Sequence, residues 1–311
     1  MGTPETGSGP RVRVSDAVAE IFPAQALSPS VLRDLADLAK PRITAMVVFT
    51  TAIGLWLAPG SIGLARSGLL LFGTALLVGS ANALNCWYER DSDALMVRTR
   101  NRPVPAGRVD SWTALALGVV AGAFAIPILA LAINPLTALL GAIAHATYVL
   151  AYTPLKRVSP WALEVGAVPG AIPPLMGWTA ATGSLGLPGL FLAAILFFWQ
   201  IPHFLAIAIY LEEDYRRGGI KVFSVERGAR LSAFRLAVYT AALVGVSLLA
   251  QPLAIAGLPY TIAAAALGAG FVVYAQRGFT GPVEGAWARR TMLYSIVWLS
   301  GVMVALVAFA R

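Results

Sequence analysis

Residues 68–88 read GLLLFGTALLVGSANALNCWY, a run with no charged side chain. A helix needs about 20 such residues to cross a hydrocarbon core. Comparable apolar runs recur along the whole chain. Hydrophobic residues make up 58% and charged residues 12% of the 311 residues, and the mean hydropathy is +0.74. Soluble domains are about 45–50% apolar and about 25% charged. The composition therefore predicts an integral membrane protein.

The apolar runs contain Gly and Pro freely and lack the alternation of outer-membrane strands, which favours an all-α bundle over a β-barrel. We predict about nine transmembrane helices. Their expected ranges are Ile43–Ala58, Gly68–Tyr88, Trp112–Ile133, Pro135–Tyr152, Trp161–Ala181, Leu187–Leu211, Leu231–Ala250, Leu253–Ala275 and Thr291–Ala310. The fifth range contains Pro169, Pro173 and Pro174, so we expect a kinked or broken helix there.

The distribution of charge predicts the topology. Of the 23 Lys and Arg, all except Arg66 and Arg311 fall on one side of the nine-span arrangement. By the positive-inside rule, the N-terminus and the loops that carry the charged clusters are cytoplasmic in a cell (inner) membrane, and the C-terminus lies on the opposite side. Residues 1–38 are predicted to be a mobile cytoplasmic tail, and residues 39–311 one nine-helix transmembrane domain. The net charge of +8 follows from this topology and indicates no nucleic-acid partner.

The first charged cluster follows the second span and contains Asn85, Glu89 and Asp93. If the helix continues to Asp93, these side chains share one face, because they are four residues apart. Neighbouring carboxylates repel each other, and Mg²⁺ relieves such repulsion, typically with one or two carboxylates plus substrate phosphates. We predict that the three residues are catalytic and bind a metal ion. The alternative is a helix end with solvated charges, which suits Arg90.

Basic residues lie just beyond these acids. Arg98 and Arg102 follow within a few positions, and guanidinium groups bind phosphate oxygens bidentately. Lys156 and Arg157 occupy the connection between the fourth and fifth spans. We predict that all four bind a diphosphate, although a juxtamembrane basic pair also serves topology.

A second charged cluster follows the sixth span. It contains Asp214, predicted to be a further catalytic metal ligand, and Arg216 and Lys221, predicted to bind diphosphate. Spacing leaves open whether Glu212, Glu213 or Asp214 faces inward, and a solvated rim remains the alternative.

A site of this kind would ionise an allylic diphosphate. Mg²⁺ and cationic side chains would stabilise the leaving pyrophosphate, on which negative charge accumulates. The apolar interior of the bundle would protect the allylic carbocation from water.

At Asn85-x-x-x-Glu89-x-x-x-Asp93 the sequence resembles the UbiA-type superfamily of intramembrane aromatic prenyltransferases, whose first motif is Asn-x-x-x-Asp-x-x-x-Asp. Glu89 stands where Asp is usual and keeps the charge. Further segments resemble the haem-farnesylating branch of the superfamily, and they occur in the same order. These segments are Leu38–Arg42, Arg98–Pro103, Tyr152–Arg157, Gly170–Trp178, Trp199–Phe204 and Glu213–Ile220. The second cluster lacks the Asp-x-x-x-Asp of quinone-directed members, so a second metal site stays open.

The resemblance implies that farnesyl diphosphate is ionised with Mg²⁺, that its C1 joins a vinyl group of haem b (protohaem IX), and that water captures the resulting cation. The products would be pyrophosphate and haem O, the latter destined for haem-copper oxidases, which are candidate assembly partners. His203, in the sixth span, would then bind the haem iron. The alternative for His203 is a hydrogen-bonded packing residue, the role that we assign to His145.

Two other functions stay open at this point. One is a related prenyltransferase acting on 4-hydroxybenzoate, a naphthoate or a chlorin, which would not accumulate haem O. The other is a transporter, because broken helices and intramembrane polar groups also occur there. A transporter would not release pyrophosphate from farnesyl diphosphate.

Overall fold

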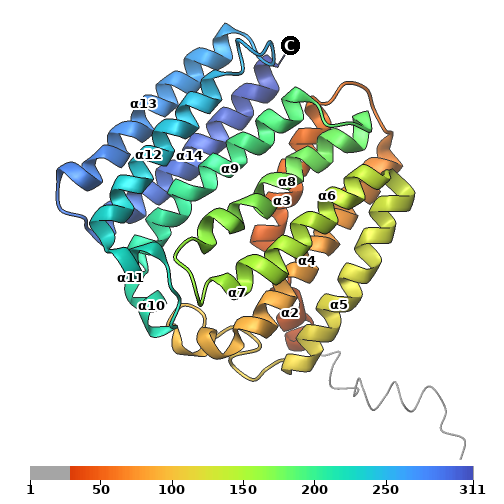
Figure 1. The fold of residues 1–311 in the computed structure, drawn as a ribbon. Helices are drawn as coiled ribbons and strands as arrows, with labels where there is room; N and C mark the ends of the chain where they lie inside the picture. The colour runs from red at the N-terminus through yellow and green to blue at the C-terminus, as the bar shows by residue number, and fades with distance from the viewer. Residues whose placement is uncertain (1–28, 311) are drawn as a thin grey trace, which may run out of the picture.

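The computed structural model describes residues 29–310, and within this range the chain folds into a bundle dominated by nine long helices (Figure 1). Two of the nine continue into short π-helical segments, η2 and η3. The helices and segments are α2 (Pro29–Leu38), α3 (Pro41–Leu57), α4 (Leu64–Leu95), α5 (Ser111–Ile128), η2 (Leu129–Ile133), α6 (Pro135–Ala146), η3 (Thr147–Tyr152), α7 (Thr153–Leu155), α8 (Ala162–Thr182), α9 (Leu187–Tyr210), α10 (Glu212–Arg217), α11 (Phe223–Arg227), α12 (Ala229–Leu248), α13 (Leu258–Thr280) and α14 (Gly285–Phe309). The predicted all-α membrane fold is confirmed.

Seven of the long helices have the length and apolar composition needed to cross a membrane, and α2 with α3, bent by 49°, makes an eighth candidate. The ninth long helix is α8, whose Glu164 and three prolines lower its apolar character. Large hydrophobic side chains such as Leu131, 87% exposed, cover the outside of the bundle. Such a surface suits a lipid environment.

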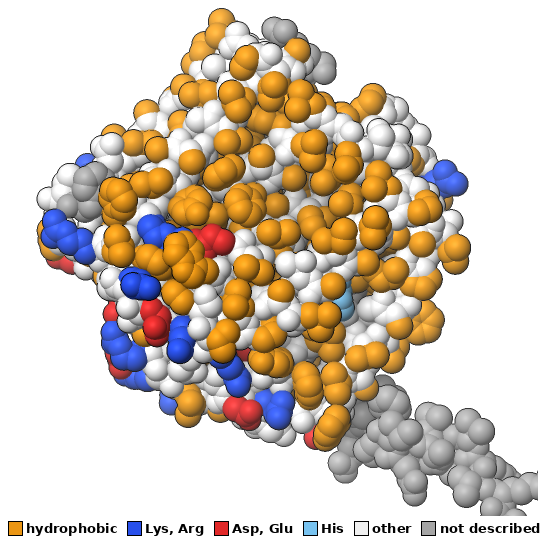
Figure 2. All heavy atoms as spheres, in the orientation of Figure 1, with side chains coloured by type: hydrophobic (Ala, Val, Ile, Leu, Met, Phe, Trp, Pro, Cys, Tyr) orange, Lys and Arg blue, Asp and Glu red, His pale blue; other side chains and the backbone are white. Residues whose placement is uncertain are grey.

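The charged side chains gather at one end of the bundle. In Figure 2 hydrophobic side chains dominate the visible face, and most Lys, Arg, Asp and Glu lie toward the end where Figure 1 shows α10 and α11. The C-terminus lies at the opposite end. Both charged clusters of the sequence therefore meet at the same end of the bundle, as the predicted topology requires.

The predicted tail and the folded domain meet earlier than expected. Residues 1–28 lie outside the described residues, but residues 29–38 form α2. Leu38, 1% exposed, packs with Cys86 and Val104, and Asp34 pairs with Arg108. An amphipathic helix with a polar face was not recognisable as part of the domain among the apolar spans.

Helix α8 is the central helix that positions the site. It runs unbroken from Ala162 to Thr182 despite Pro169, Pro173 and Pro174, so of the expected kink or break, the break does not occur. It packs against α3, α6 and α9. A Cβ atom on Gly54 of α3 would lie 1.9 Å from the carbonyl oxygen of Pro174, and one on Gly177 would lie 2.0 Å from that of Thr51. The two backbones thus touch directly, and only glycine permits this.

We expect Gly54→Ala to destabilise the bundle, because the added methyl group meets rigid backbone. Overpacking of this kind costs about 1–3 kcal/mol. The measurement is the thermal unfolding temperature in detergent. Gly68→Ala on α4 is the matched control, since its Cβ would meet nothing within 4 Å. Equal unfolding temperatures for the two variants would contradict the close α3–α8 contact.

Candidate active site

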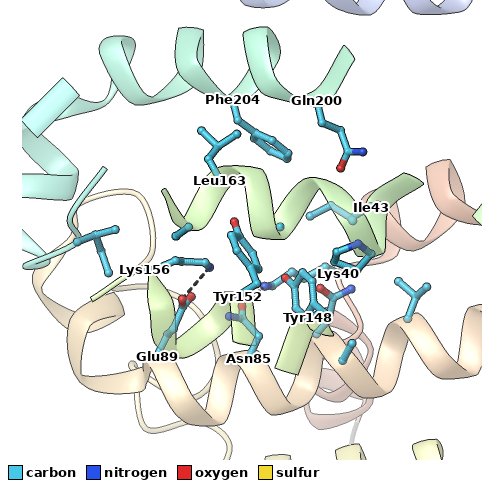
Figure 3. A pocket seen from close by; sticks show the side chains of 18 of the residues that line it. Lys40, Ile43, Asn85, Glu89, Tyr148, Tyr152, Lys156, Leu163, Gln200 and Phe204 are labelled. Atoms are coloured by element: carbon cyan, nitrogen blue, oxygen red, sulfur yellow. Dashed lines mark hydrogen bonds and ion pairs between the residues drawn. The ribbon is translucent and has the colours of Figure 1, made fainter. Parts of the chain in front are cut away.

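A cavity of about 340 Å³ opens inside the charged end of the bundle. This volume lies within the range of about 300–1,000 Å³ that is usual for ligand pockets. Its walls come from α3, α4, the α6–α7 segment, α8 and α9, with residues from the connection after α10 (Figure 3). Most of the wall is apolar. The polar and charged residues that line it include Lys40, Asn82, Asn85, Glu89, Asp93, Arg98, Arg102, His145, Tyr148, Tyr152, Lys156, Gln200, Tyr215 and Lys221.

The acidic face of α4 forms one wall of this cavity. The helix continues to Leu95, as predicted, so Asn85, Glu89 and Asp93 lie on one face. Their exposed fractions are 2%, 6% and 1%. Buried carboxylates are costly unless they are paired, and the structure supplies a cationic partner for each position.

Three cations approach this face from three different segments. Lys40 Nζ donates to Asn85 Oδ1 at 2.7 Å. Lys156 Nζ donates to Glu89 Oε1 at 2.7 Å (Figure 3), and Arg102 Nη1 donates to Asp93 Oδ2 at 2.6 Å. Short charge-assisted bonds of this kind are strong.

The pKa values of the two paired cations outside the spans reflect this pairing. Burial alone would lower the pKa of Lys156, but the neighbouring Tyr152 and Glu89 outweigh it, so the pKa lies above its ordinary value. Burial likewise acts against the charge of Arg102, and the adjacent Asp93 raises its pKa overall. Both side chains are positively charged at neutral pH.

The donor set on α4 suits a Mg²⁺ ion that shares its coordination with a substrate. Asp93 Oδ1 is buried and has no hydrogen-bond partner, so it has a free acceptor position. Within residues 29–310 no three His, Cys, Asp or Glu side chains gather into a metal-binding group. Mg²⁺ bound through one or two carboxylates completes its shell with water and phosphate oxygens. The residues present therefore fit such an ion, and their role as ligands stays a prediction.

Lys40 is a site residue for which no role was predicted, although it lies in the segment Leu38–Arg42. It lies between α2 and α3 in a left-handed conformation, with φ 48° and ψ 68°, and Pro41 begins α3. This conformation is uncommon for a residue with a side chain and is held only where the surroundings require it. The available signal was a lysine placed directly before an apolar span.

Two tyrosines also escaped sequence reasoning. Tyr148 and Tyr152 belong to η3, where a π-helical stretch interrupts the regular helix, a feature frequent at functional sites. Their ring centroids are 5.3 Å apart, and Lys156 Nζ lies 4.5 Å from the Tyr152 ring. Figure 3 shows both rings between the acidic face of α4 and Phe204 on α9.

The second acidic cluster has a different placement from the first. Asp214 does not line the cavity; its two carboxylate oxygens accept from the backbone N–H groups of Val97 and Arg98, both at 3.0 Å. Asp214 thus fixes the loop that carries Arg98. Arg216 is exposed and pairs with Glu212 and Glu213.

The remaining predicted diphosphate residues divide into two groups. Arg98, Arg102, Lys156 and Lys221 line the cavity. Arg157 does not: it donates to the carbonyl oxygen of Tyr88 at 3.3 Å and to Ser92 Oγ at 3.2 Å, and so links its segment to α4. The structure thus brings together Asn85, Glu89, Asp93 and four of the six predicted cations, and leaves out Arg157, Arg216 and Asp214.

His203 lies on the side of α9 that faces α14. Its Nδ1 is 2.7 Å from Ser295 Oγ, and its ring stacks on Trp199. Ser295 Oγ donates to Met292 O at 2.6 Å, so Nδ1 is the donor in the histidine contact and Nε2 carries the lone pair. His203 is not a lining residue of the cavity, and its role as a haem ligand stays a prediction. His145 lines the cavity and contacts Ser80 Oγ at 2.8 Å through Nε2.

An apolar cavity inside a membrane bundle, ending in paired carboxylates and surplus cations, defines the class of intramembrane enzymes that handle lipid diphosphates. The chain belongs to the UbiA prenyltransferase family, which matches residues 47–297. It is 55% identical, over 90% of its length, to a protein of Anaeromyxobacter sp. (strain Fw109-5) named protoheme IX farnesyltransferase, of which it covers 94%.

Solved structures show the same fold. A structure of digeranylgeranylglyceryl phosphate synthase superimposes with a TM-score of 0.76, at 17% identity, covering 89% of this chain and 97% of that one. A UbiA homologue from Archaeoglobus fulgidus, bound to GPP and Mg²⁺, superimposes with a TM-score of 0.57 at 14% identity, covering 88% and 99%.

Proposed function

We propose that this prenyltransferase transfers a farnesyl group from farnesyl diphosphate to a vinyl group of haem b, with addition of water, to give haem O and pyrophosphate. The observation that supports a diphosphate substrate best is the set of cations around Asn85, Glu89 and Asp93 in the wall of a largely apolar cavity. The farnesyl group and the haem acceptor are supported by the protoheme IX farnesyltransferase from Anaeromyxobacter, which is similar over nearly the whole chain.

The cationic side chains account for the departure of pyrophosphate. Glu89 and Asp93 would hold a Mg²⁺ ion, and the positive charge it supplies would stabilise the leaving diphosphate. Lys156 and Arg102 come from two segments and pair with Glu89 and Asp93, which are neighbours on α4. Arg98 and Lys221 add positive charge to the wall of the same cavity. Fixed cations stabilise a developing anion at little reorganisation cost, because they are already in position.

Farnesyl transfer breaks one C–O bond and forms one C–C bond and one new C–O bond. The C1–O bond of farnesyl diphosphate breaks, and pyrophosphate leaves with the electron pair. The vinyl group of haem attacks C1 and forms a C–C bond, which leaves a cation on the carbon next to the porphyrin ring. Water attacks this cation and loses a proton. The rings of Tyr148 and Tyr152 lie beside the cationic end, where their faces would stabilise the allylic cation.

The placement of the charged residues argues against a transporter and agrees with the predicted orientation in the membrane. The acids and cations crowd one end of the bundle, whereas transporter sites usually lie near the bilayer midplane. We propose a multi-pass protein of the cell membrane, with the N-terminus and this end cytoplasmic and the C-terminus on the other side. Haem-copper oxidases are the proposed consumers of the product and candidate assembly partners.

The decisive experiment is haem extraction. Membranes from a host that makes no haem O of its own are loaded with haem b, Mg²⁺ and farnesyl diphosphate, and the extracted haems are separated and weighed by mass spectrometry. We expect haem O and an equal amount of pyrophosphate, and neither in membranes without the protein. Prenylation of an added quinone precursor in place of haem would overturn the acceptor assignment.

Asp214 gives a prediction that separates loop positioning from metal binding. In Asp214→Ala the backbone N–H groups of Val97 and Arg98 lose their partner, so the loop loosens and Arg98 leaves the cavity. Hydrogen bonds to a charged group contribute about 1.5–3 kcal/mol, so we expect the KM for farnesyl diphosphate to rise about tenfold with an unchanged Mg²⁺ requirement.

Glu213→Ala is the matched control, since Glu213 pairs only with the exposed Arg216 and Arg217. The result that contradicts loop positioning is a raised Mg²⁺ requirement in Asp214→Ala with the KM for farnesyl diphosphate unchanged, because that is the behaviour of a metal ligand.

A further inference from the structure

Gln200 presents a fixed hydrogen-bond acceptor to the apolar part of the cavity. The residue belongs to α9, is 6% exposed and lines the cavity. Its Nε2 donates to the carbonyl oxygens of Leu196, at 2.9 Å, and Ala167, at 3.3 Å. An amide oxygen cannot lie against two carbonyl oxygens, so the assignment of nitrogen and oxygen is unambiguous. Both N–H groups of the amide are therefore used, and Oε1 lies on the side of Gly170.

A glycine of α8 makes room for this oxygen. A Cβ atom on Gly170 would lie 1.9 Å from Gln200 Oε1, so any other residue would displace the amide. Figure 3 shows Gln200 reaching from α9 toward α8, one helical turn from Phe204. Within the described part of the chain, no group donates a hydrogen bond to Oε1.

An acceptor of this kind needs a ligand with a donor group. Leu163, Pro173 and Phe204 line the same part of the wall and offer no hydrogen bond. A polar group in apolar surroundings is destabilising when it stays unpaired. The ligand therefore carries an O–H or N–H group, and water is the smallest molecule that does.

We propose that Gln200 Oε1 holds the water molecule that captures the carbocation in the last step of the reaction. The proposal rests on the proposed function. The water donates one O–H to Oε1, which turns a lone pair of its oxygen toward the cavity. This oxygen forms the new C–O bond at the cationic carbon, and its other proton passes to the released pyrophosphate. Gln200 only orients the water, because a neutral amide is not a base at physiological pH.

The alternative fate of the cation makes the proposal testable. Without a positioned water, the cation loses a proton from a neighbouring carbon and becomes an alkene. The farnesylated haem is then lighter by one water molecule. The ratio of hydroxylated to dehydrated product therefore reports on water positioning, whereas a general loss of structure lowers both products together.

The experiment is the haem extraction assay on Gln200→Met, which keeps the side-chain length and removes the acceptor. We expect the ratio of hydroxylated to dehydrated product to fall about tenfold, the effect of one hydrogen bond of about 1.4 kcal/mol, while consumption of farnesyl diphosphate changes less. Gly170→Ala displaces the Gln200 amide without removing it, so it should lower the ratio too. If Gln200→Met does not accumulate in the membrane, the ratio in Gly170→Ala tests the proposal by itself. Gln276→Met, an exposed position of α13, is the matched control.

An unchanged product ratio in both cavity variants overturns the proposal, even if their total activity falls. Failure of the proposed function gives a different result, because the unaltered protein would then make no farnesylated haem of either mass.

Discussion

Asp93→Asn is expected to abolish turnover and leave the protein folded and inserted. The substitution keeps the volume of a side chain that is 1% exposed. It removes the negative charge that balances Arg102. It also replaces the free carboxylate oxygen Oδ1 with a neutral amide group, which is a weaker ligand for Mg²⁺. Loss of a Mg²⁺ ligand costs several kcal/mol of transition-state stabilisation, so the rate should fall on the order of a thousandfold or more. The measurement is pyrophosphate release from farnesyl diphosphate in purified membranes.

Arg90→Ala is the control for this substitution. Arg90 belongs to the same helix but donates to the carbonyl oxygen of Trp87 and pairs weakly with Asp91, outside the cavity. Its rate should stay near that of the unaltered protein. A near-normal rate in Asp93→Asn would show that α4 holds no catalytic metal.

Lys156→Met should have the second largest effect. The variant keeps an unbranched side chain of similar length but removes the ammonium that bonds Glu89 and lies against the Tyr152 ring. Removing one preorganised group that stabilises a developing anion costs about a hundredfold or more in rate. The kcat/KM for farnesyl diphosphate should fall by about this factor.

Arg289→Met is the matched control for Lys156→Met, because it removes one exposed positive charge from α14 without touching the cavity. Equal losses in the two variants would mean that Lys156 acts only through the net charge of the surface, and Glu89 would then need another partner.

The sequence predicted those features that depend on local periodicity. Spans of about 20 apolar residues predict membrane helices in any tertiary context, and the four-residue spacing of Asn85, Glu89 and Asp93 determines a shared face once α4 continues. Both features appear in the structure. The side to which Asp214 points was not predictable, because α10 is too short for its orientation to follow from a pattern.

Features that depend on packing between distant segments escaped prediction. Lys40 reaches Asn85 across 45 residues of sequence, and Lys156 reaches Glu89 across 67. Tyr148 lies in no motif and Tyr152 only begins the segment Tyr152–Arg157, and both rings belong to the π-helical stretch of η3. Helix α8 stays unbroken because α3, α6 and α9 surround it, a constraint that its three prolines do not reveal.

The pairing of Lys40, Lys156 and Arg102 with the face of α4 has a thermodynamic consequence. In the structure the charges of Lys156 and Arg102 are compensated by Glu89 and Asp93, and Lys40 donates to the neutral amide of Asn85. A diphosphate that takes over these cations leaves Glu89 and Asp93 without counterions, and a divalent cation that takes over the carboxylates leaves Lys156 and Arg102 without theirs. Either ligand alone creates buried uncompensated charge, whereas the two together exchange one set of partners for another. We therefore expect their binding to be cooperative, and by linkage each should raise the affinity of the other by the same factor.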